Sequence, residues 1–176
     1  MGNEVRALVI GPLGFGVHSQ AESVSQRLQL PLASAGEILR SSVSEHIPLG
    51  LQLQKRMEVG KPASDDLVCR IITDRLSASD YSGGWVMEGF PRNIRQARLL
   101  SDLLHEKGDR LSMVLYTSAP DRASTYKRHL HHREPRTDTS SIRQRLRADE
   151  ARFRDLMKFY REMLLPIETY FSSSSD

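Results

Sequence analysis

The sequence predicts an α/β fold in which a parallel sheet of about four strands is covered by helices on both faces. Short apolar runs rich in β-branched residues alternate along the chain with longer segments whose apolar residues recur at helical spacing. Strands that alternate with helices pair in parallel, because each helix returns the chain to the edge where the next strand begins. The length of 176 residues and the apolar fraction of 39% suit one folded domain over residues 1–176.

The first half of the chain contains two expected strands. The run Val5–Ile10 is apolar and ends at Gly11-Pro12, so it predicts a buried strand followed by a turn. Helical spacing follows from about Val17 to Leu28, and a brief second strand is expected at Pro31–Ser34. Two helices are expected next, and Pro48 lies in the first turn of the second one, which Gly60 follows. These two helices are expected at Ala35–Ser44 and Pro48–Val59.

The second half continues the alternation. Residues 64–66, Ser-Asp-Asp, are typical of a helix N-terminus and precede a helix expected at Leu67–Leu76. Two glycines then precede a third strand, Trp85–Met87. The remaining expected elements are a helix at Ile94–His105, a strand at Leu111–Tyr116, a helix at about Asp121–His132, a polar loop at Arg133–Asp138 and a long helix ending near Phe171.

The loop after the first expected strand, GPLGFGVHS, has the glycines of a phosphate-binding loop. Glycine lets the backbone approach an anion closely, and the following helix would direct free N–H groups at the same place. Val17 stands where a working loop carries lysine, and His18 is cationic only part of the time near neutral pH. A tight strand-to-helix turn without a ligand is the alternative interpretation. The candidate donor phosphate-binding residues are Gly11, Gly14, Gly16, Val17, His18 and Ser19.

Composition narrows the classes of partner. A formal net charge of +3 suits an anionic ligand but is too small to indicate nucleic acid. No apolar run is long enough to span a membrane, and no secretory signal is present. The single cysteine, Cys69, lies in an apolar helical pattern and is expected to be a buried thiol. We therefore expect the cytoplasm or another reducing compartment.

Four further stretches follow the loop in order along the chain. They are LASAGEILR (32–40), LGLQLQKRMEVGKPASDDLV (49–68), MEGFPRNIRQA (87–97), and RHLHHREPRTD (128–138) with IRQRL (142–146) beyond it. Together with the loop, they resemble the adenylate kinase family of nucleoside monophosphate kinases. The resemblance implies a three-layer P-loop nucleotide-kinase fold. Its parts would be a monophosphate-binding insert at about 35–66, a short lid at about 133–138 and a frayed tail at 172–176.

The resemblance also implies the ligands, which are AMP or another nucleoside monophosphate as acceptor and ATP with Mg²⁺ as donor. Transfer between two phosphorylated ligands needs many negative charges neutralised and aligned, a task suited to arginine forks. The implied catalytic residues are Arg92, Arg128, Arg133, Arg136 and Arg145, with Asp138 helping to hold the lid arginines. The implied AMP-binding residues are Ala35, Arg40, Ala63, Val68, Gly89, Arg92 and Gln96. Ser19 and, through water, Glu88 would face the metal; Glu88 stands where the family usually has aspartate.

Signals for the acceptor base conflict. Gln96 matches the glutamine that reads adenine in adenylate kinases, and an amide can pair with adenine through two hydrogen bonds. Ala35 and Asn93 instead look like the branch that acts on UMP and CMP. We favour AMP because Gln96 would contact the base edge directly, and UMP or CMP remains the alternative.

Two departures from the family fall on the donor side. One is Val17. The other is the end of the chain, IETYFSSSSD, where the family continues with one more strand and a helix, whose connection helps to hold the donor adenine. A four-stranded sheet would leave an open edge, which a protein partner or self-association would cover. Two functions therefore stay open. One is a weak kinase that converts ATP and AMP into two ADP, and the other is a catalytically inactive nucleotide-binding or structural subunit of a larger assembly.

Overall fold

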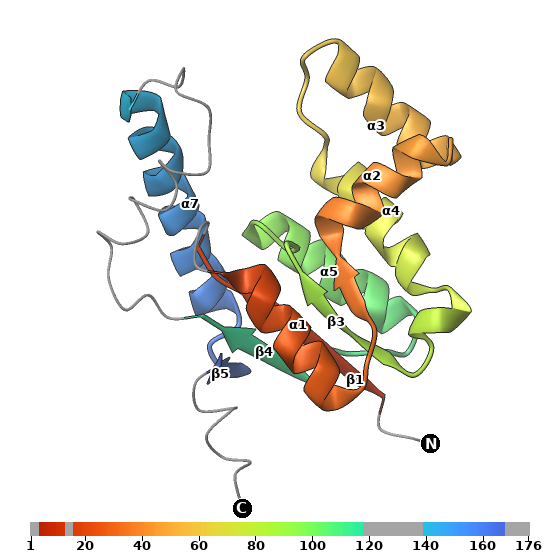
Figure 1. Ribbon diagram of the computed structural model, residues 1–176, viewed down its shortest axis with the longest axis vertical. Helices are drawn as coiled ribbons and strands as arrows, with labels where there is room; N and C mark the ends of the chain where they lie inside the picture. Colours follow the sequence, from red (N-terminus) through yellow and green to blue (C-terminus); the bar gives the residue numbers. More distant parts are fainter. Residues whose placement is uncertain (1–3, 13–15, 118–138, 168–176) are drawn as a thin grey trace, which may run out of the picture.

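The computed structural model describes residues 4–12, 16–117 and 139–167, with the side chains of 139–146 left out. These segments form a parallel sheet of five strands in the order β2-β3-β1-β4-β5 (Figure 1). The strands are β1 (Val5–Ile10), β2 (Leu32–Ser34), β3 (Gly84–Glu88), β4 (Met113–Tyr116) and β5 (Leu164–Pro166). The α/β fold expected from the sequence is confirmed.

Six α-helices lie in the described segments. They are α1 (Val17–Leu28), α2 (Ala35–Ser44), α3 (Pro48–Glu58), α4 (Asp65–Leu76), α5 (Ile94–Glu106) and α7 (Thr139–Phe159), and a short 3₁₀ turn, η1 (Ser79–Tyr81), precedes β3. A membrane crossing needs a long apolar helix, and none of the helices described here meets both conditions.

The fifth strand corrects the expected count of about four. The last helix was expected to continue to about Phe171, but it ends at Phe159, and Leu164–Pro166 pairs in parallel with β4. The edge of β4 that we expected to be open therefore carries β5. A strand of three residues has no periodicity of its own, so two leucines after a helix look like its continuation. Pro166 lies in this outer strand, where a missing N–H is tolerated.

Two apolar clusters, one on each face of the sheet, form the core. Ala7 and Val9 of β1 pack with α1 on one face, and Leu8 and Ile10 pack on the other, where α4, α5 and α7 contribute. Figure 1 shows α1 on one side of the sheet and α5 on the opposite side. Burial on both faces explains why β1 is a continuous apolar run.

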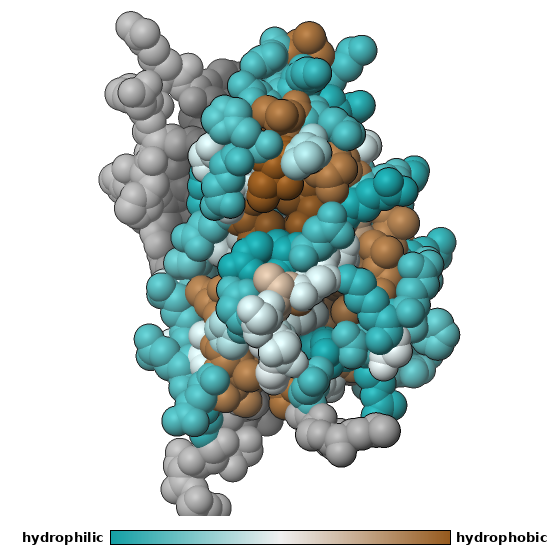
Figure 2. Space-filling model, turned by 90° about the vertical axis from the view of Figure 1, so that its right-hand side faces the viewer, coloured by the Kyte–Doolittle hydropathy of each residue, from teal (hydrophilic) through white to brown (hydrophobic). Residues whose placement is uncertain are grey.

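Helices α2 and α3, with the start of α4, form an arm beside the sheet (Figure 1). From the side of this arm, Figure 2 shows apolar side chains gathered in the upper part of the molecule and rimmed by polar ones. The arm's helices meet closely at Gly50, where an added Cβ would overlap the carbonyl group of Ser42. The absence of a side chain at Gly50 therefore sets the distance between α2 and α3.

Replacing Gly50 with alanine should destabilise the arm. The added methyl group would press on the backbone of α2, and overpacking of this kind costs about 1–3 kcal/mol. Urea denaturation of Gly50→Ala would measure the free energy of unfolding. Gly83→Ala is the matched control, because an added Cβ there meets no heavy atom within 4 Å and should change stability by less than about 0.5 kcal/mol. Equal stability of the two variants would contradict the close contact.

The thiol of Cys69 should react with alkylating reagents only when the protein unfolds. Cys69 is buried in α4, as expected from the sequence, and burial together with the nearby Asp66 and Asp65 raises its pKa to about 11. Because the thiolate is the reactive form, native Cys69 should be alkylated slowly at neutral pH and rapidly in denaturant. Mass spectrometry of timed iodoacetamide reactions measures both rates. A native rate close to the denatured rate would show that the thiol is accessible.

Candidate functional site

The candidate site lies at the carboxyl ends of the parallel strands, where ligands bind in open α/β sheets. A pocket of about 310 Å³ opens there between the loops that follow β1 and β3 and the inner side of α7. Its lining residues are Val9–Pro12, Gly16–His18, Glu88–Arg92, Phe153 and Leu156. Sequence reasoning missed the two α7 residues, because their helical spacing marks them only as core.

The expected donor loop leads into α1, whose first backbone N–H groups have no partner within the helix. Gly16 caps the helix in the left-handed conformation, with φ 69°, and, having no side chain, it accepts no hydrogen bond from the first turn of α1. The first turn also holds no acidic residue. The amino end of this helix is therefore left with N–H groups and partial positive charge facing the pocket mouth. Gly14 lies outside the described residues.

Val17, which stands where lysine was expected, is partly buried at the edge of the apolar core and also lines the pocket. It packs against the cluster that includes Ala7, Val9 and Ala21. A Cβ added to Gly11 would lie 2.8 Å from Val17 Cγ2 and would also overlap the Thr117 hydroxyl. The base of the loop is therefore held by close apolar packing at the position where a phosphate-binding loop has its cation.

Glu88 joins three elements at the mouth of this pocket. Its Oε1 accepts a hydrogen bond from Ser34 Oγ at the end of β2 and lies 3.4 Å from His18 Nδ1 in α1. His18 Nε2 lies 3.5 Å from Glu22, so the imidazole stands between two carboxylates. The exposed fraction is 52% for the His18 side chain and 14% for that of Glu88. Sequence reasoning missed Ser34, whose neighbour on the adjacent strand only the sheet register reveals.

The donor set at this end of the sheet suits a magnesium ion that arrives with a nucleotide. No group of three or more histidine, cysteine or acidic side chains is placed to hold a metal among residues 4–12, 16–117 and 147–167. Mg²⁺ commonly keeps several waters and takes one or two carboxylates together with substrate phosphates. Glu88 offers one such carboxylate at the pocket, and Ser19 is an exposed hydroxyl-bearing residue in the first turn of α1. The fit does not extend to His18, which offers a competing cation to Glu88 when it is protonated.

The acceptor-side arginines lie around the first turn of α2. Arg92 Nε donates a hydrogen bond to the Gly89 carbonyl at 3.0 Å. Gly89, with φ 76°, approaches Ala35, because a Cβ built there would lie 3.6 Å from the Ala35 Cβ. The Arg40 guanidinium lies near Gly36, with Nη1 3.1 Å from a Cβ built there. Both arginines are exposed, and within the described segments neither forms an ion pair with a carboxylate.

Gln96 is buried, and both ends of its amide have partners. Its Oε1 accepts from the backbone N–H of Arg92 at 2.8 Å, and its Nε2 donates to Asp65 Oδ1 at 2.8 Å. Asn93 caps α5 and also donates to Asp65. A primary amide has two donor hydrogens and two acceptor lone pairs, so one of each remains available to a base. Sequence reasoning missed Asp65, which it interpreted only as part of a helix N-terminus.

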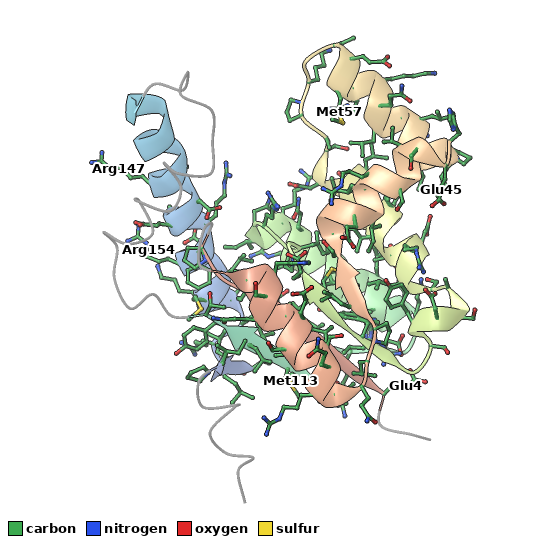
Figure 3. All side chains as sticks on the ribbon, in the orientation of Figure 1. Glu4, Glu45, Met57, Met113, Arg147 and Arg154 are labelled. Atoms are coloured by element: carbon green, nitrogen blue, oxygen red, sulfur yellow. The ribbon has the colours of Figure 1, made fainter. Side chains whose placement is uncertain are left out.

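Several expected site residues cannot be placed around the pocket. Arg128, Arg133, Arg136 and Asp138 lie outside the described residues. Arg145 falls within α7, but its side chain is also outside them. Figure 3 shows that two other arginines of α7, Arg147 and Arg154, point away from the α2–α4 arm. Of the remaining expected AMP-binding residues, Ala63 and Val68 are partly buried and pack against the core.

Known proteins of one family match this chain over most of its length. The family model described as adenylate kinase matches residues 9–164. An adenylate kinase of Beijerinckia indica is 32% identical over 171 residues, covering 96% of this chain and 86% of the relative. One of Methylobacterium radiotolerans is 31% identical over 170 residues, covering 96% and 83%. A shorter match to an adenylate kinase of Caldicellulosiruptor bescii is 38% identical over 117 residues, covering 66% and 54%.

The family model begins within β1 and ends at the first residue of β5, so it spans the loop, the arm and the segment around Arg92 and Gln96. This confirms the resemblance seen in the sequence. The chain belongs to the adenylate kinase family.

Proposed function

We propose that this protein binds AMP and transfers a phosphoryl group to it from ATP, slowly, giving two ADP. The observation that carries the proposal is the acceptor side of the site. Arg40 and Arg92 are exposed and without carboxylate partners in the described segments, and Gln96 keeps a donor and an acceptor for a base. Free guanidinium groups near a glycine-lined turn suit a monophosphate, which they bind through paired hydrogen bonds. Residues 35–66 would form the insert that encloses it.

The donor side would act mainly through the backbone. The N–H groups at the start of α1 would bind the phosphates of ATP, and Gly11 and Gly16 would let them approach. Mg²⁺ bound with ATP would supply charge neutralisation between phosphate oxygens, and Ser19 and the water-linked Glu88 would hold it. Arg128, Arg133, Arg136 and Arg145 would close over the transferring group, with Asp138 holding the lid. Arg92 would align the acceptor oxygen with that group.

The proposed rate is low because position 17 supplies no charge. A phosphate-binding loop places a lysine against the terminal phosphates, and Val17 directs a methyl group toward Gly11 instead. Removing one preorganised donor of this kind typically lowers turnover by about 100- to 1000-fold. His18 does not occupy the same place, because its imidazole faces Glu88 and Glu22.

A catalytically inactive, nucleotide-binding subunit is the second candidate, and the packing of Val17 favours it. A partly buried valine that packs against the core is what selection for shape, rather than for transfer, would retain. UMP or CMP in place of AMP is a further alternative for the acceptor. Calorimetric titration separates these candidates, with AMP, CMP, UMP, ATP–Mg²⁺ and a dinucleotide that joins two adenosines through five phosphates as ligands. Binding of AMP alone would support the inactive subunit.

Introducing the missing cation should raise both donor affinity and turnover. Val17→Lys would place an ammonium group at the loop, and we expect turnover of ATP and AMP to rise by about 100-fold or more. The lost apolar contact with the core should cost about 1 kcal/mol of stability. A coupled assay of ADP formation and a titration with ATP–Mg²⁺ measure the gain.

The matched control for this variant is Val17→Gln, which has a long polar side chain without the charge. It should lose the same packing and gain no turnover. If Val17→Lys folds and binds ATP–Mg²⁺ no better than Val17→Gln, the rest of the donor site is not competent, and the inactive subunit is the better description.

Removing the acceptor guanidinium should weaken AMP binding specifically. Arg92→Gln removes the guanidinium group next to Gly89. We expect the AMP dissociation constant to rise by about 10- to 100-fold, because a charge-assisted hydrogen bond is lost. Arg98→Gln removes the same charge from an exposed position in α5, the helix that follows Arg92, and should leave the constant unchanged. Calorimetry with AMP measures both. Equal effects of the two variants would mean that only net charge matters.

A further inference from the structure

A connected set of hydrogen bonds surrounds Gln96. The backbone N–H of Arg92 donates to Gln96 Oε1, and Gln96 Nε2 donates to Asp65 Oδ1. The same Asp65 oxygen accepts from Asn93 Nδ2 at 3.1 Å, and Asn93 Oδ1 in turn accepts from the backbone N–H of Gln96 at 2.8 Å. The set therefore closes on itself and ties the start of α4 to the start of α5.

These partners determine which way the Gln96 amide faces. A carboxylate only accepts hydrogen bonds and a backbone N–H only donates them. Rotating the amide by half a turn would place two acceptors together at Asp65 and two donors together at Arg92. With an exposed fraction of 8%, Gln96 has little access to water that could satisfy the mismatched groups. The oxygen end and the nitrogen end of the amide are therefore fixed in space.

We propose that Asp65 is a positioning residue for base selection: by fixing the orientation of the Gln96 amide, it makes the acceptor site distinguish amino bases from oxo bases. The inference rests on the proposed function, in which Gln96 reads the acceptor base. Adenine presents an amino donor beside a ring-nitrogen acceptor, and hypoxanthine presents a carbonyl acceptor beside a ring N–H. A freely rotating amide serves both patterns equally, whereas a fixed amide matches only one of them.

The same logic extends to pyrimidines, where the fixed amide distinguishes two bases of equal size. Cytosine repeats the adenine order of amino donor and ring acceptor, and uracil has the reversed order. For the AMP acceptor proposed above, the fixed amide favours the amino bases in each pair. Ring size, which the amide does not sense, separates AMP from CMP.

Two adjacent aspartates provide a matched comparison. Asp66 follows Asp65 in the first turn of α4, but its carboxylate is exposed and pairs with Arg95 Nη2 at 2.8 Å, away from Gln96. Replacing either residue with alanine removes one negative charge from the same helix N-terminus. The two variants therefore share the loss of one charge at the start of α4. Asp65→Ala loses the hydrogen bonds from Gln96 and Asn93, whereas Asp66→Ala loses the ion pair with Arg95.

The experiment compares calorimetric dissociation constants of the wild-type protein, Asp65→Ala and Asp66→Ala for AMP against IMP and for CMP against UMP. We expect the wild type to prefer the amino member of each pair by about 10- to 100-fold. Asp65→Ala should reduce this ratio about tenfold, mainly by binding the oxo nucleotides better, and Asp66→Ala should keep it. A general loosening of the fold would weaken both members of a pair and leave the ratio unchanged.

Two results would overturn the proposal. If the wild type binds AMP and Asp65→Ala keeps the wild-type ratio, Asp65 does not set base selection, although the proposed function stands. If the wild type binds none of the four monophosphates, both inferences fail.

A nucleotide-independent measurement covers the case in which Asp65→Ala does not fold. NMR of the wild type should show slowed hydrogen exchange at the Gln96 side-chain amide relative to exposed Gln52. Equal exchange at the two side chains would show a mobile amide and would also overturn the proposal.

Discussion

Strand β1 lies between β3 and β4 and pairs with both in parallel, so it is covered by strands at its edges and by helices on its faces. Ala7, Leu8 and Val9 have no solvent exposure at all. Pairing on both edges fixes the register of β1 against β3 and β4, so the position of its last residue is also fixed. The turn that begins at Gly11 therefore has a fixed position relative to the ends of β3 and β4. The site depends on this constraint, because the donor loop, Glu88 at the end of β3 and Thr117 after β4 all come to the carboxyl end of the same three strands.

The proposed acceptor side and the proposed donor side differ in the side chains that they place at this end of the sheet. The proposed acceptor side presents polar groups: exposed guanidinium groups, and a buried amide held by Asp65 and by a backbone N–H. On the donor side, the loop backbone keeps its amino-terminal N–H groups, but an apolar side chain packs beneath it. A charge at position 17 would serve catalysis, whereas a valine there serves the core. Stability and turnover therefore make opposite demands on one residue.

The segment after α7 decides how the sheet ends. Backbone pairing of Val114–Tyr116 with Leu164–Pro166 satisfies the outer edge of β4 and brings Ile167 into the cluster beneath α1. The chain needs no second protein to cover β4. The new edge is three residues long and includes a proline, both of which discourage pairing with another strand.

The sequence by itself determined the layered α/β fold, most helix boundaries and the position of the turn between β1 and α1, because apolar periodicity, glycines and capping residues act within a few neighbours. It also proposed Arg92 and Gln96 as site residues through their family motif. Only the tertiary structure decided that Leu164–Pro166 forms a strand, that Val17 faces the core, that Glu88 meets Ser34 and His18, and that Asp65 orients Gln96. Each of these depends on residues separated by many positions, and a local pattern carries no information about which distant groups the folded sheet will bring into contact.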